Sequence, residues 1–200
     1  MRNPIDRLTA GLPHPARVAI DWVVTLAVAV GIVLGVKAWV VNPYRIPTSS
    51  MEPTLHCAAP AEGCLASSSD RVLANRFIFR FRDPKRGEVV VFETPPAAQR
   101  LCNASGTFVK RIVGLPGETI EDRDGFLYAN GKRLEEPYAH DRDATHSGKR
   151  WALHEGQYLM VGDNRANSCD SRVWGPVSRA NLIGPVFATY WPPNRISLGS

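Results

Sequence analysis

The sequence contains none of the closely spaced cysteine and histidine pairs that usually bind zinc. Its four cysteines are Cys57, Cys64, Cys102 and Cys169, and no two of them form a C-x2-C pair. An EF-hand is excluded as well, because the spacing and the terminal glutamate of that calcium loop are missing around Asp163 and Asp170. We therefore expect neither a metal nor a cofactor.

Runs of lysine or arginine are also missing, although the formal net charge is +5. The basic residues are scattered, and no recognised nucleic-acid-binding motif occurs. Nucleic acid is therefore not an expected partner. The mild positive charge suits an anionic membrane surface instead.

One long hydrophobic run is present. From Trp22 to Val41 the chain is apolar except for one threonine and Lys37. This length is close to what a helix needs to cross a hydrocarbon core ~30 Å thick. Lys37 lies near the far end, where its stem would reach the headgroups, and Trp22 and Trp39 suit the two interfaces. We predict a transmembrane anchor over residues 18–41.

A cleaved signal sequence is the alternative, because Arg17 precedes the run. However, the run is longer than a typical signal core, and no clean small-x-small cleavage site follows it. Arginines before the span and few basic residues just after it predict a cytoplasmic tail, residues 1–17, and an extracytoplasmic domain, residues 42–200. The chain is then a single-pass protein of the plasma membrane, in contact with membrane lipid.

After the anchor, helical periodicity nearly disappears, and short β-branched or aromatic runs alternate with glycine and proline. Such runs predict strands, at residues 71–79, 87–93, 107–113, 126–128, 132–134, 157–161 and 186–191. Asn130-Gly131 is typical of a tight hairpin. Other stretches look like loops, namely residues 57–69, 95–105 and 137–149. The segments together predict a mainly β domain.

Ser50 lies just beyond the anchor, in a segment that is unsuited to a helix interior or a central strand. Pro47 and Pro53 fix φ on either side of it and remove backbone donors. The segment is a rigid turn that presents a row of hydroxyls, Thr48-Ser49-Ser50. A serine hydroxyl needs a base beside it to act as a nucleophile at neutral pH.

Two kinds of base are available to Ser50. Four histidines lie beyond the anchor, in predicted loops or turns without a motif: His56, His140, His146 and His154. A Ser-His-Asp triad stays open, because triads are recognised by geometry. Lys110 is the other candidate, since on a strand it shares a face with Phe108 and Ile112, and an apolar wall lowers the pKa of a lysine. From this stretch alone, two solvated cations, Lys110 and Arg111, are the simpler interpretation.

Three motifs stand in one order along the chain: Ser50-Met51-Glu52-Pro53-Thr54, then Lys110-Arg111-Ile112-Val113-Gly114-Leu115-Pro116-Gly117-Glu118, then Gly162-Asp163-Asn164-Arg165-Ala166-Asn167-Ser168-Cys169-Asp170-Ser171-Arg172. With the preceding span, they resemble bacterial type I signal peptidases over about residues 18–192. The resemblance implies a catalytic domain of coiled antiparallel sheets behind one transmembrane helix. It implies a serine endopeptidase that removes signal peptides from exported preproteins at small-x-small sites, near the Sec or Tat machinery.

The resemblance also implies roles for individual residues. Ser50 is the nucleophile and Lys110 the general base, acting through an acyl-enzyme. The Ser50 N–H and the hydroxyl of Thr48, where many family members have serine, are the oxyanion donors. Ser168 orients the lysine amine, and Asp170 and Arg172 hold the site together by pairing.

The substrate pockets are shallow and apolar by the same resemblance. The residues expected near them are Ile46, Pro47, Met51 and Val109. Pockets of this kind admit only small side chains, which accounts for a small-x-small preference.

The cysteines also predict cross-links. Cys57 and Cys64 flank a turn-rich hexapeptide, which suits a short disulfide in an oxidising compartment. Cys102 and Cys169 are candidates for a second bridge, but the sequence does not fix their pairing.

Two other functions are compatible with parts of the sequence. A self-cleaving repressor of the related Ser/Lys fold would need a DNA-binding amino-terminal domain, where this chain has its hydrophobic span. A single-span β-domain adaptor or a degenerate peptidase homologue needs no catalysis, and the presence of both Ser50 and Lys110 argues against degeneracy.

Overall fold

The computed structural model describes residues 13–39, 41–103 and 105–199, without the side chains of residues 36–39. The chain divides into two compact units, Met1–Val40 and Val41–Ser200. Each unit is described by itself below.

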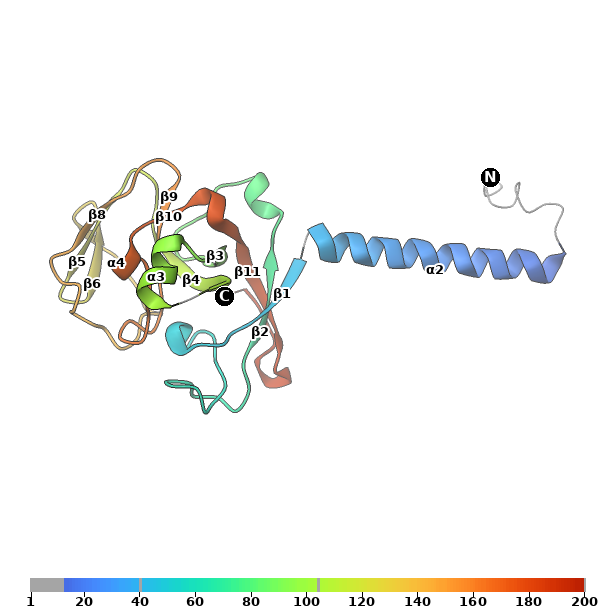
Figure 1. Ribbon diagram of the computed structural model, residues 1–200, viewed down its shortest axis with the longest axis horizontal. Coiled ribbons are helices and arrows are strands. Elements are labelled where there is room, and N and C mark those ends of the chain that lie inside the picture. The colour runs from blue at the N-terminus through green and yellow to red at the C-terminus, as the bar shows by residue number, and fades with distance from the viewer. Residues whose placement is uncertain (1–12, 40, 104, 200) are drawn as a thin grey trace. The chain divides into compact units, whose positions relative to one another are not determined.

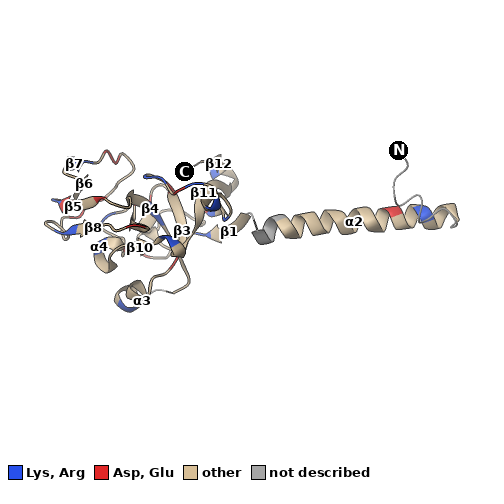
Figure 2. Cartoon of the chain, turned by 90° about the horizontal axis from the view of Figure 1, so that it is seen from above, with Lys and Arg blue, Asp and Glu red and all other residues tan. Residues whose placement is uncertain are grey.

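The described part of the first unit forms a long helix, α2 (His14–Trp39), which begins before the predicted anchor (Figure 1). Its His14–Gly35 part has a mean hydropathy of 2.3 and is long enough to cross a membrane. Charged residues lie only in its amino-terminal turns among the described side chains, as Figure 2 shows. The predicted interfacial roles of Lys37 and Trp39 lie outside the described side chains.

The second unit is built on an antiparallel sheet of eight strands, seven of them in the order β1-β2-β11-β3-β4-β9-β10 with β12 paired to β11. Its strands are β1 (Val41–Arg45), β2 (Arg71–Asn75), β3 (Val89–Glu93), β4 (Thr107–Gly114), β9 (Gln157–Val161), β10 (Val177–Ser178), β11 (Leu182–Trp191) and β12 (Ser197–Leu198). Register shifts interrupt the pairing of β11 with β2 and with β3, and of β4 with β9. Such irregularities bend and twist a sheet, and Figure 1 shows the curled strands.

A smaller antiparallel sheet lies beside the large one, in the order β7-β6-β5-β8 (Figure 1). Its strands are β5 (Thr119–Arg123), β6 (Phe126–Ala129), β7 (Lys132–Arg133) and β8 (Arg150–Ala152). The turn between β6 and β7 has positive φ at Asn130 and Gly131, which confirms the predicted hairpin. The prediction of a mainly β fold of coiled antiparallel sheets is also confirmed.

Short helices connect the strands. They are η1 (Ser49–Met51), η2 (Ile78–Arg80), α3 (Pro96–Cys102), α4 (Ser171–Trp174), η3 (Arg179–Asn181) and η4 (Pro193–Arg195). The predicted loop over residues 95–105 is therefore wrong in its first part, where α3 forms. Pro96 stands at the first helical turn, good helix formers follow, and Asn103 ends the helix with a φ of +48°.

The predicted strand over residues 71–79 is too long. The strand ends at Asn75, because the Asn75 side chain accepts hydrogen bonds from the backbone N–H groups of Phe77 and Ile78, at 2.9 and 3.0 Å. This local bonding turns the chain into η2 and takes its backbone out of the sheet.

The large sheet is buried on both faces at its centre. Along β3, Val89 and Val91 belong to one hydrophobic cluster, and Val90 and Phe92 belong to another. The neighbouring strand β4 therefore also lies between two layers of side chains. This position determines the surroundings of the two cations that β4 carries.

Candidate active site

The serine turn leads directly from β1 into the interior of the domain. Ser50 lies on η1 and is 5% exposed. Its carbonyl oxygen accepts a hydrogen bond from the N–H of Asn164 at 3.1 Å, which ties the turn to the segment after β9. Met51, beside it, is buried in the first hydrophobic cluster. The backbone of Ser50 is thus held by both bonding and packing.

Lys110 reaches Ser50 from β4. Its Nζ lies 2.5 Å from Ser50 Oγ, and its side chain is almost fully buried, at 2% exposed. The ring of Phe108, two residues earlier on the strand, lies 4.9 Å from the same nitrogen. Arg111 is 5% exposed. The interpretation of Lys110 and Arg111 as two solvated cations is therefore wrong.

Burial changes the acid–base properties of Lys110. Desolvation lowers the pKa of its amine from 10.5 to about 8, against the opposing charges of Asp170 and Asp163. A neutral amine is consequently accessible near neutral pH, and a neutral amine can accept a proton from a serine hydroxyl.

A buried ion pair connects the three sequence motifs. Arg111 donates to both carboxylate oxygens of Asp163, from Nε at 2.8 Å and from Nη2 at 2.6 Å. Thr54 donates its hydroxyl to the same carboxylate at 2.6 Å. The bidentate geometry fixes the serine turn, β4 and the segment after β9 relative to one another. None of these three residues is among the predicted site residues, although the place of each within a motif is a usable signal.

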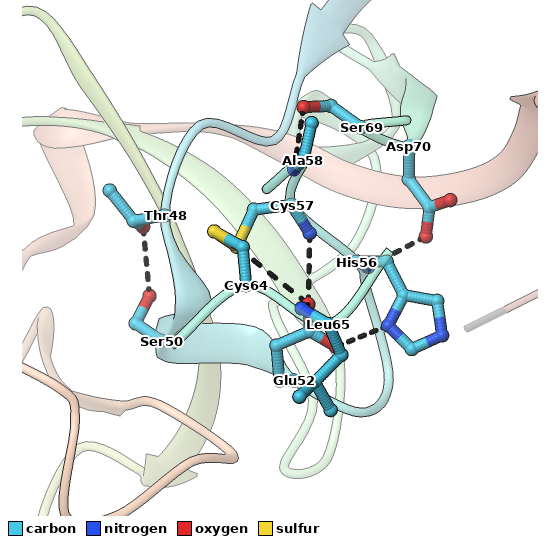
Figure 3. Close-up of a disulfide and its surroundings, with 10 residues drawn as sticks. All are labelled: Thr48, Ser50, Glu52, His56, Cys57, Ala58, Cys64, Leu65, Ser69 and Asp70. Carbon is cyan, nitrogen blue, oxygen red and sulfur yellow. Dashed lines mark hydrogen bonds and ion pairs between the residues drawn. A yellow bond between two sulfur atoms is a disulfide. The ribbon is translucent and has the colours of Figure 1, made fainter. Parts of the chain in front are cut away.

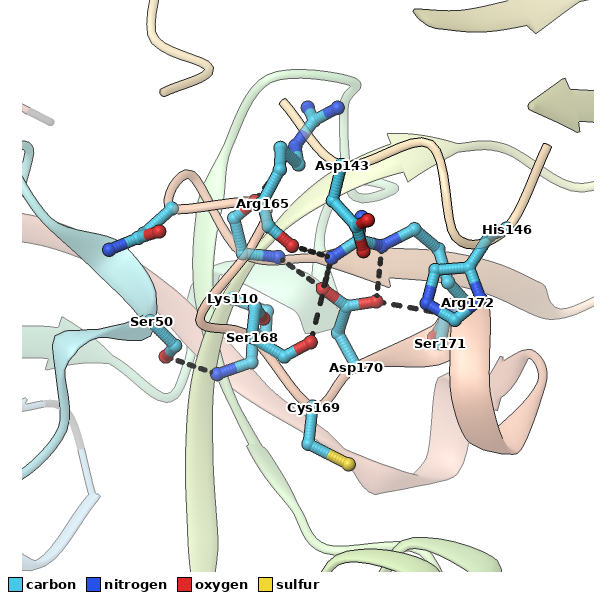
Figure 4. Close-up of polar contacts among 12 residues, drawn as sticks. Ser50, Lys110, Asp143, His146, Arg165, Ser168, Cys169, Asp170, Ser171 and Arg172 are labelled. Atoms are coloured by element: carbon cyan, nitrogen blue, oxygen red, sulfur yellow. Dashed lines mark hydrogen bonds and ion pairs between the residues drawn. The ribbon is translucent and has the colours of Figure 1, made fainter. Parts of the chain in front are cut away.

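A second buried pair holds the end of the third motif. Arg172 donates to Asp170 from Nε and from Nη2, both at 2.9 Å, and the N–H of Gly162 donates to Asp170 at 3.1 Å. Burial alone would raise the pKa of Asp170, but the hydrogen bonds and charge of Arg172 outweigh it and lower that pKa. Asp170 also accepts the N–H of Arg172 at the start of α4. Figure 4 shows this pair beside Ser50 and Lys110.

The two predicted orienting hydroxyls take different positions. Thr48 is exposed, and its Oγ1 lies 3.4 Å from Ser50 Oγ (Figure 3). Ser168 is buried, and its hydroxyl makes no hydrogen bond of good geometry within the described part of the chain. The bond from Ser168 to the lysine amine is thus not formed in this structure and stays a prediction.

A cleft of about 600 Å³ opens beside the serine and the lysine. The serine turn forms one wall, and the end of α3 with the start of β4 forms the other. All four residues predicted to lie near the substrate pockets line this cleft: Ile46, Pro47, Met51 and Val109. Among the described residues, no group of three His, Cys, Asp or Glu side chains is arranged to hold a metal ion.

The chain is similar in sequence to known proteins of one family. The profile of the family "Signal peptidase, peptidase S26" matches residues 19–191. The chain belongs to this family. It is 40% identical over 174 residues to "Probable signal peptidase I-2" of Synechocystis sp., covering 87% of this chain and 74% of that protein. It is 32% identical over 196 residues to "Signal peptidase I" of Leptolyngbya laminosa, covering 98% and 91%.

A solved structure was also matched, a signal peptidase I from Enterococcus faecalis, with 32% identity and a TM-score of 0.42. The match covers 52% of this chain and 97% of that one. The family establishes a membrane-associated serine endopeptidase that acts on the signal peptides of exported preproteins. The predictions of a type I signal peptidase and of a serine hydrolase are confirmed.

Two disulfides lie near the site of this peptidase. Cys57 is bonded to Cys64, and Cys102 to Cys169. The first closes a loop on the serine turn, where the buried Glu52 carboxylate accepts the N–H of Cys57 at 3.0 Å (Figure 3).

Glu52 is also the partner of His56, the candidate base that lies nearest to Ser50 in the sequence. The Nδ1 atom of His56 is paired with the Glu52 carboxylate. This contact gives the ring a structural partner within the loop. Glu52 is not among the predicted site residues, and its place between Met51 and Pro53 in the first motif is the available signal.

Proposed function

We propose that the chain removes signal peptides by a Ser50/Lys110 dyad, through an acyl-enzyme, at small-x-small sites. The observation that carries this proposal is the 2.5 Å separation of Lys110 Nζ and Ser50 Oγ in a buried site that borders the cleft. The distance lies within the reach required for proton transfer. The depressed pKa of the lysine supports the same role.

In the acylation step, neutral Lys110 takes the proton from Ser50 as the oxygen attacks the carbonyl carbon of the residue before the scissile bond. The resulting oxyanion is stabilised by the Ser50 N–H and the Thr48 hydroxyl. The leaving amine then takes the proton from the lysine ammonium as the peptide bond breaks, which leaves an ester on Ser50. Water, deprotonated by Lys110, hydrolyses the ester and regenerates the serine.

Ser168, Asp170 and Arg172 support this chemistry without reacting. Asp170 and Arg172 form a buried ion pair, which holds the turn that carries Ser168 in place. From that turn the Ser168 hydroxyl oxygen would accept a hydrogen bond from an N–H of the neutral Lys110 amine. With one N–H directed at Ser168, the single lone pair of the amine is free to face the Ser50 hydroxyl.

Specificity follows from the walls of the cleft. Ile46 and Met51 are buried apolar residues, and Val109 and Pro47 line the cleft with them. Side chains this close to the nucleophile leave room for a methyl group at the residue before the scissile bond. Shortening Ile46 or Val109 to Ala is therefore expected to raise kcat/KM for peptides with Val at that position by roughly tenfold, since one or two methylenes contribute about 1–3 kcal/mol.

This prediction is checked by steady-state kinetics on paired peptides that differ only in the residue before the cut. Exposed Leu198→Ala serves as the control for a shortened aliphatic side chain. An unchanged Ala-to-Val ratio in both Ile46→Ala and Val109→Ala would remove these residues from the pocket.

The surroundings of the enzyme follow from its first unit. Residues 18–41 anchor the chain in the plasma membrane lipid, residues 1–17 stay in the cytoplasm, and residues 42–200 lie outside, near the Sec or Tat machinery that delivers substrates. The apolar length of α2 and the arginines before it support this orientation.

The proposal is tested with the purified full chain in detergent and a peptide that contains one Ala-x-Ala site. The expected result is cleavage after the second Ala, shown by the masses of both products, and no cleavage by Ser50→Ala. Cleavage that persists in Ser50→Ala would assign the activity to another nucleophile. An inert wild type on several such peptides would favour the non-catalytic adaptor.

A further inference from the structure

The second disulfide, Cys102–Cys169, joins the end of α3 to the segment after β9, beside the cleft. Cys102 is the last residue of α3, and Cys169 lies 67 residues later, between Ser168 and Asp170. Both cysteines line the cleft together with Val109. The bond therefore borders the space in which the substrate would lie.

The two ends of this bond differ in how firmly the rest of the structure holds them. On the Cys169 side, the next residue, Asp170, accepts hydrogen bonds from Gly162 and from three nitrogen atoms of Arg172. These contacts are buried. The turn that carries Cys169 is thus fixed without the disulfide.

On the Cys102 side the attachment is much weaker. Helix α3 has seven residues, too few to be stable alone. Ala97 and Ala98, near its start, pack in the second hydrophobic cluster. At its carboxyl end Leu101 is 60% exposed, and Cys102 is the residue that packs against that cluster. The segment that contains α3 is closed at its two ends by Thr94 and Gly106. The N–H and the hydroxyl of Thr94 both donate to the carbonyl oxygen of Gly106, at 3.0 Å. The carboxyl end of α3 is therefore held mainly through Cys102.

We propose that the Cys102–Cys169 disulfide is a specificity-determining element, which fixes the end of α3 as a close wall of the substrate cleft. The inference rests on the proposed function of the site. With the bond intact, the wall stays near Ser50 and Lys110 and restricts the side chains that fit. Two-electron reduction by a dithiol or a phosphine gives two thiols, releases α3 and widens the cleft.

The consequence for catalysis is specific. Small Ala side chains lose contact with the wall, so KM for an Ala-x-Ala peptide rises, by roughly tenfold if the lost contact equals one or two methylenes. Peptides with Val before the cut gain access, so the Ala-to-Val ratio of kcat/KM falls by a similar factor. The acid limb of the pH–rate profile stays in place, because Ser50 and Lys110 are positioned by contacts that the bond does not make.

The other disulfide provides a matched control. Cys57 and Cys64 close a loop of short span, seven residues apart, and neither lines the cleft. The variant Cys57→Ser/Cys64→Ser retains only the Cys102–Cys169 bond. It is expected to keep the wild-type Ala-to-Val ratio, whatever its stability.

The experiment uses full chains in detergent, with Ellman titration to count open thiols and far-UV circular dichroism to verify folding. Cys102→Ser/Cys169→Ser is compared with the control variant on the paired peptides. Because a double variant can fail to fold, the folded control variant is also assayed before reduction, after reduction with a phosphine, and after reoxidation. Reduction should lower the Ala-to-Val ratio about tenfold, and reoxidation should restore it.

An unchanged ratio in the reduced, folded control variant would overturn the inference. A shift of the acid limb on reduction would also overturn it, since the bond would then act on the dyad and not on the wall. Failure of the oxidised wild type to cut any Ala-x-Ala peptide would instead contradict the proposed function.

Discussion

Lys110→Met is expected to lower kcat/KM for an Ala-x-Ala peptide by roughly 10³-fold, within the range that general acid–base groups contribute. Methionine fills nearly the same volume beside Phe108 but cannot accept the Ser50 proton. Exposed Lys132→Met on β7 is the matched control, and its activity should equal that of the wild type. Steady-state rates over pH 6–10 check the prediction.

The pH dependence gives the prediction a second, independent readout. Because the amine has a pKa of about 8, the wild-type rate should rise tenfold per pH unit below that value and level off above it. Lys132→Met should show the same limb, and Lys110→Met should lack it. A Lys110→Met variant that keeps the rate and the limb would return His56, His140, His146 and His154 as candidate bases.

The same lysine should reduce the stability of the fold. Its pKa is near 10.5 in the unfolded chain and about 8 in the folded one, so the unfolded chain binds more protons between these values. The free energy of unfolding therefore rises with pH across this interval. At pH 7 the shift corresponds to a cost of about 3 kcal/mol, so Lys110→Met should melt at a higher temperature than the wild type at pH 7 and by a smaller margin at pH 10.

The strand pattern of this chain was largely predictable, and the exceptions have local causes. Alternation and turn residues located β4 and the β6–β7 hairpin, because those signals act within a few residues. The strand beginning at Arg71 was overextended, since its end depends on hydrogen bonds from the Asn75 side chain to backbone groups just beyond it. The sequence of α3 contains good helix formers after Pro96. The prolines at its start favour a loop as well, so the local sequence does not decide between a loop and a helix.

The site itself was only partly predictable. The resemblance to signal peptidases identifies Ser50 and Lys110, but Lys110-Arg111 alone predicts two solvated cations. Lys110 and Arg111 are buried because β4 lies between β3 and β9 in the sheet. The order of strands in a sheet is not a property of the local sequence. The pairing of Thr54, Arg111 and Asp163 likewise joins segments far apart in the chain. Residue type and spacing do not reveal this pairing, and the only signal in the sequence is the place of each residue within one of the three motifs.

Gly162→Ala is expected to lower kcat/KM by roughly 10²-fold, the effect of displacing reacting groups by about 1 Å. A Cβ at this position would collide with Ser168 Oγ and would lie 2.5 Å from the carbonyl oxygen of Ser50. Contacts this short force movement, and the Ser50 oxygen belongs to the main chain of the nucleophile. The serine turn must therefore shift relative to Lys110, although no reacting group has been removed.

Gly114→Ala separates this effect from a loss of stability. A Cβ there would also be too close to its neighbours, at 2.6 Å from Leu153 and 2.7 Å from Ile120, but those side chains belong to the third hydrophobic cluster, away from the cleft. Both variants should lose about 1–3 kcal/mol of stability from overpacking. Only Gly162→Ala should lose activity per folded molecule, measured by kinetics below its melting temperature. Equal activity losses in the two variants would mean that Gly162 acts through stability alone, and that the closeness of the Ser50 carbonyl to this glycine has no part in holding the nucleophile.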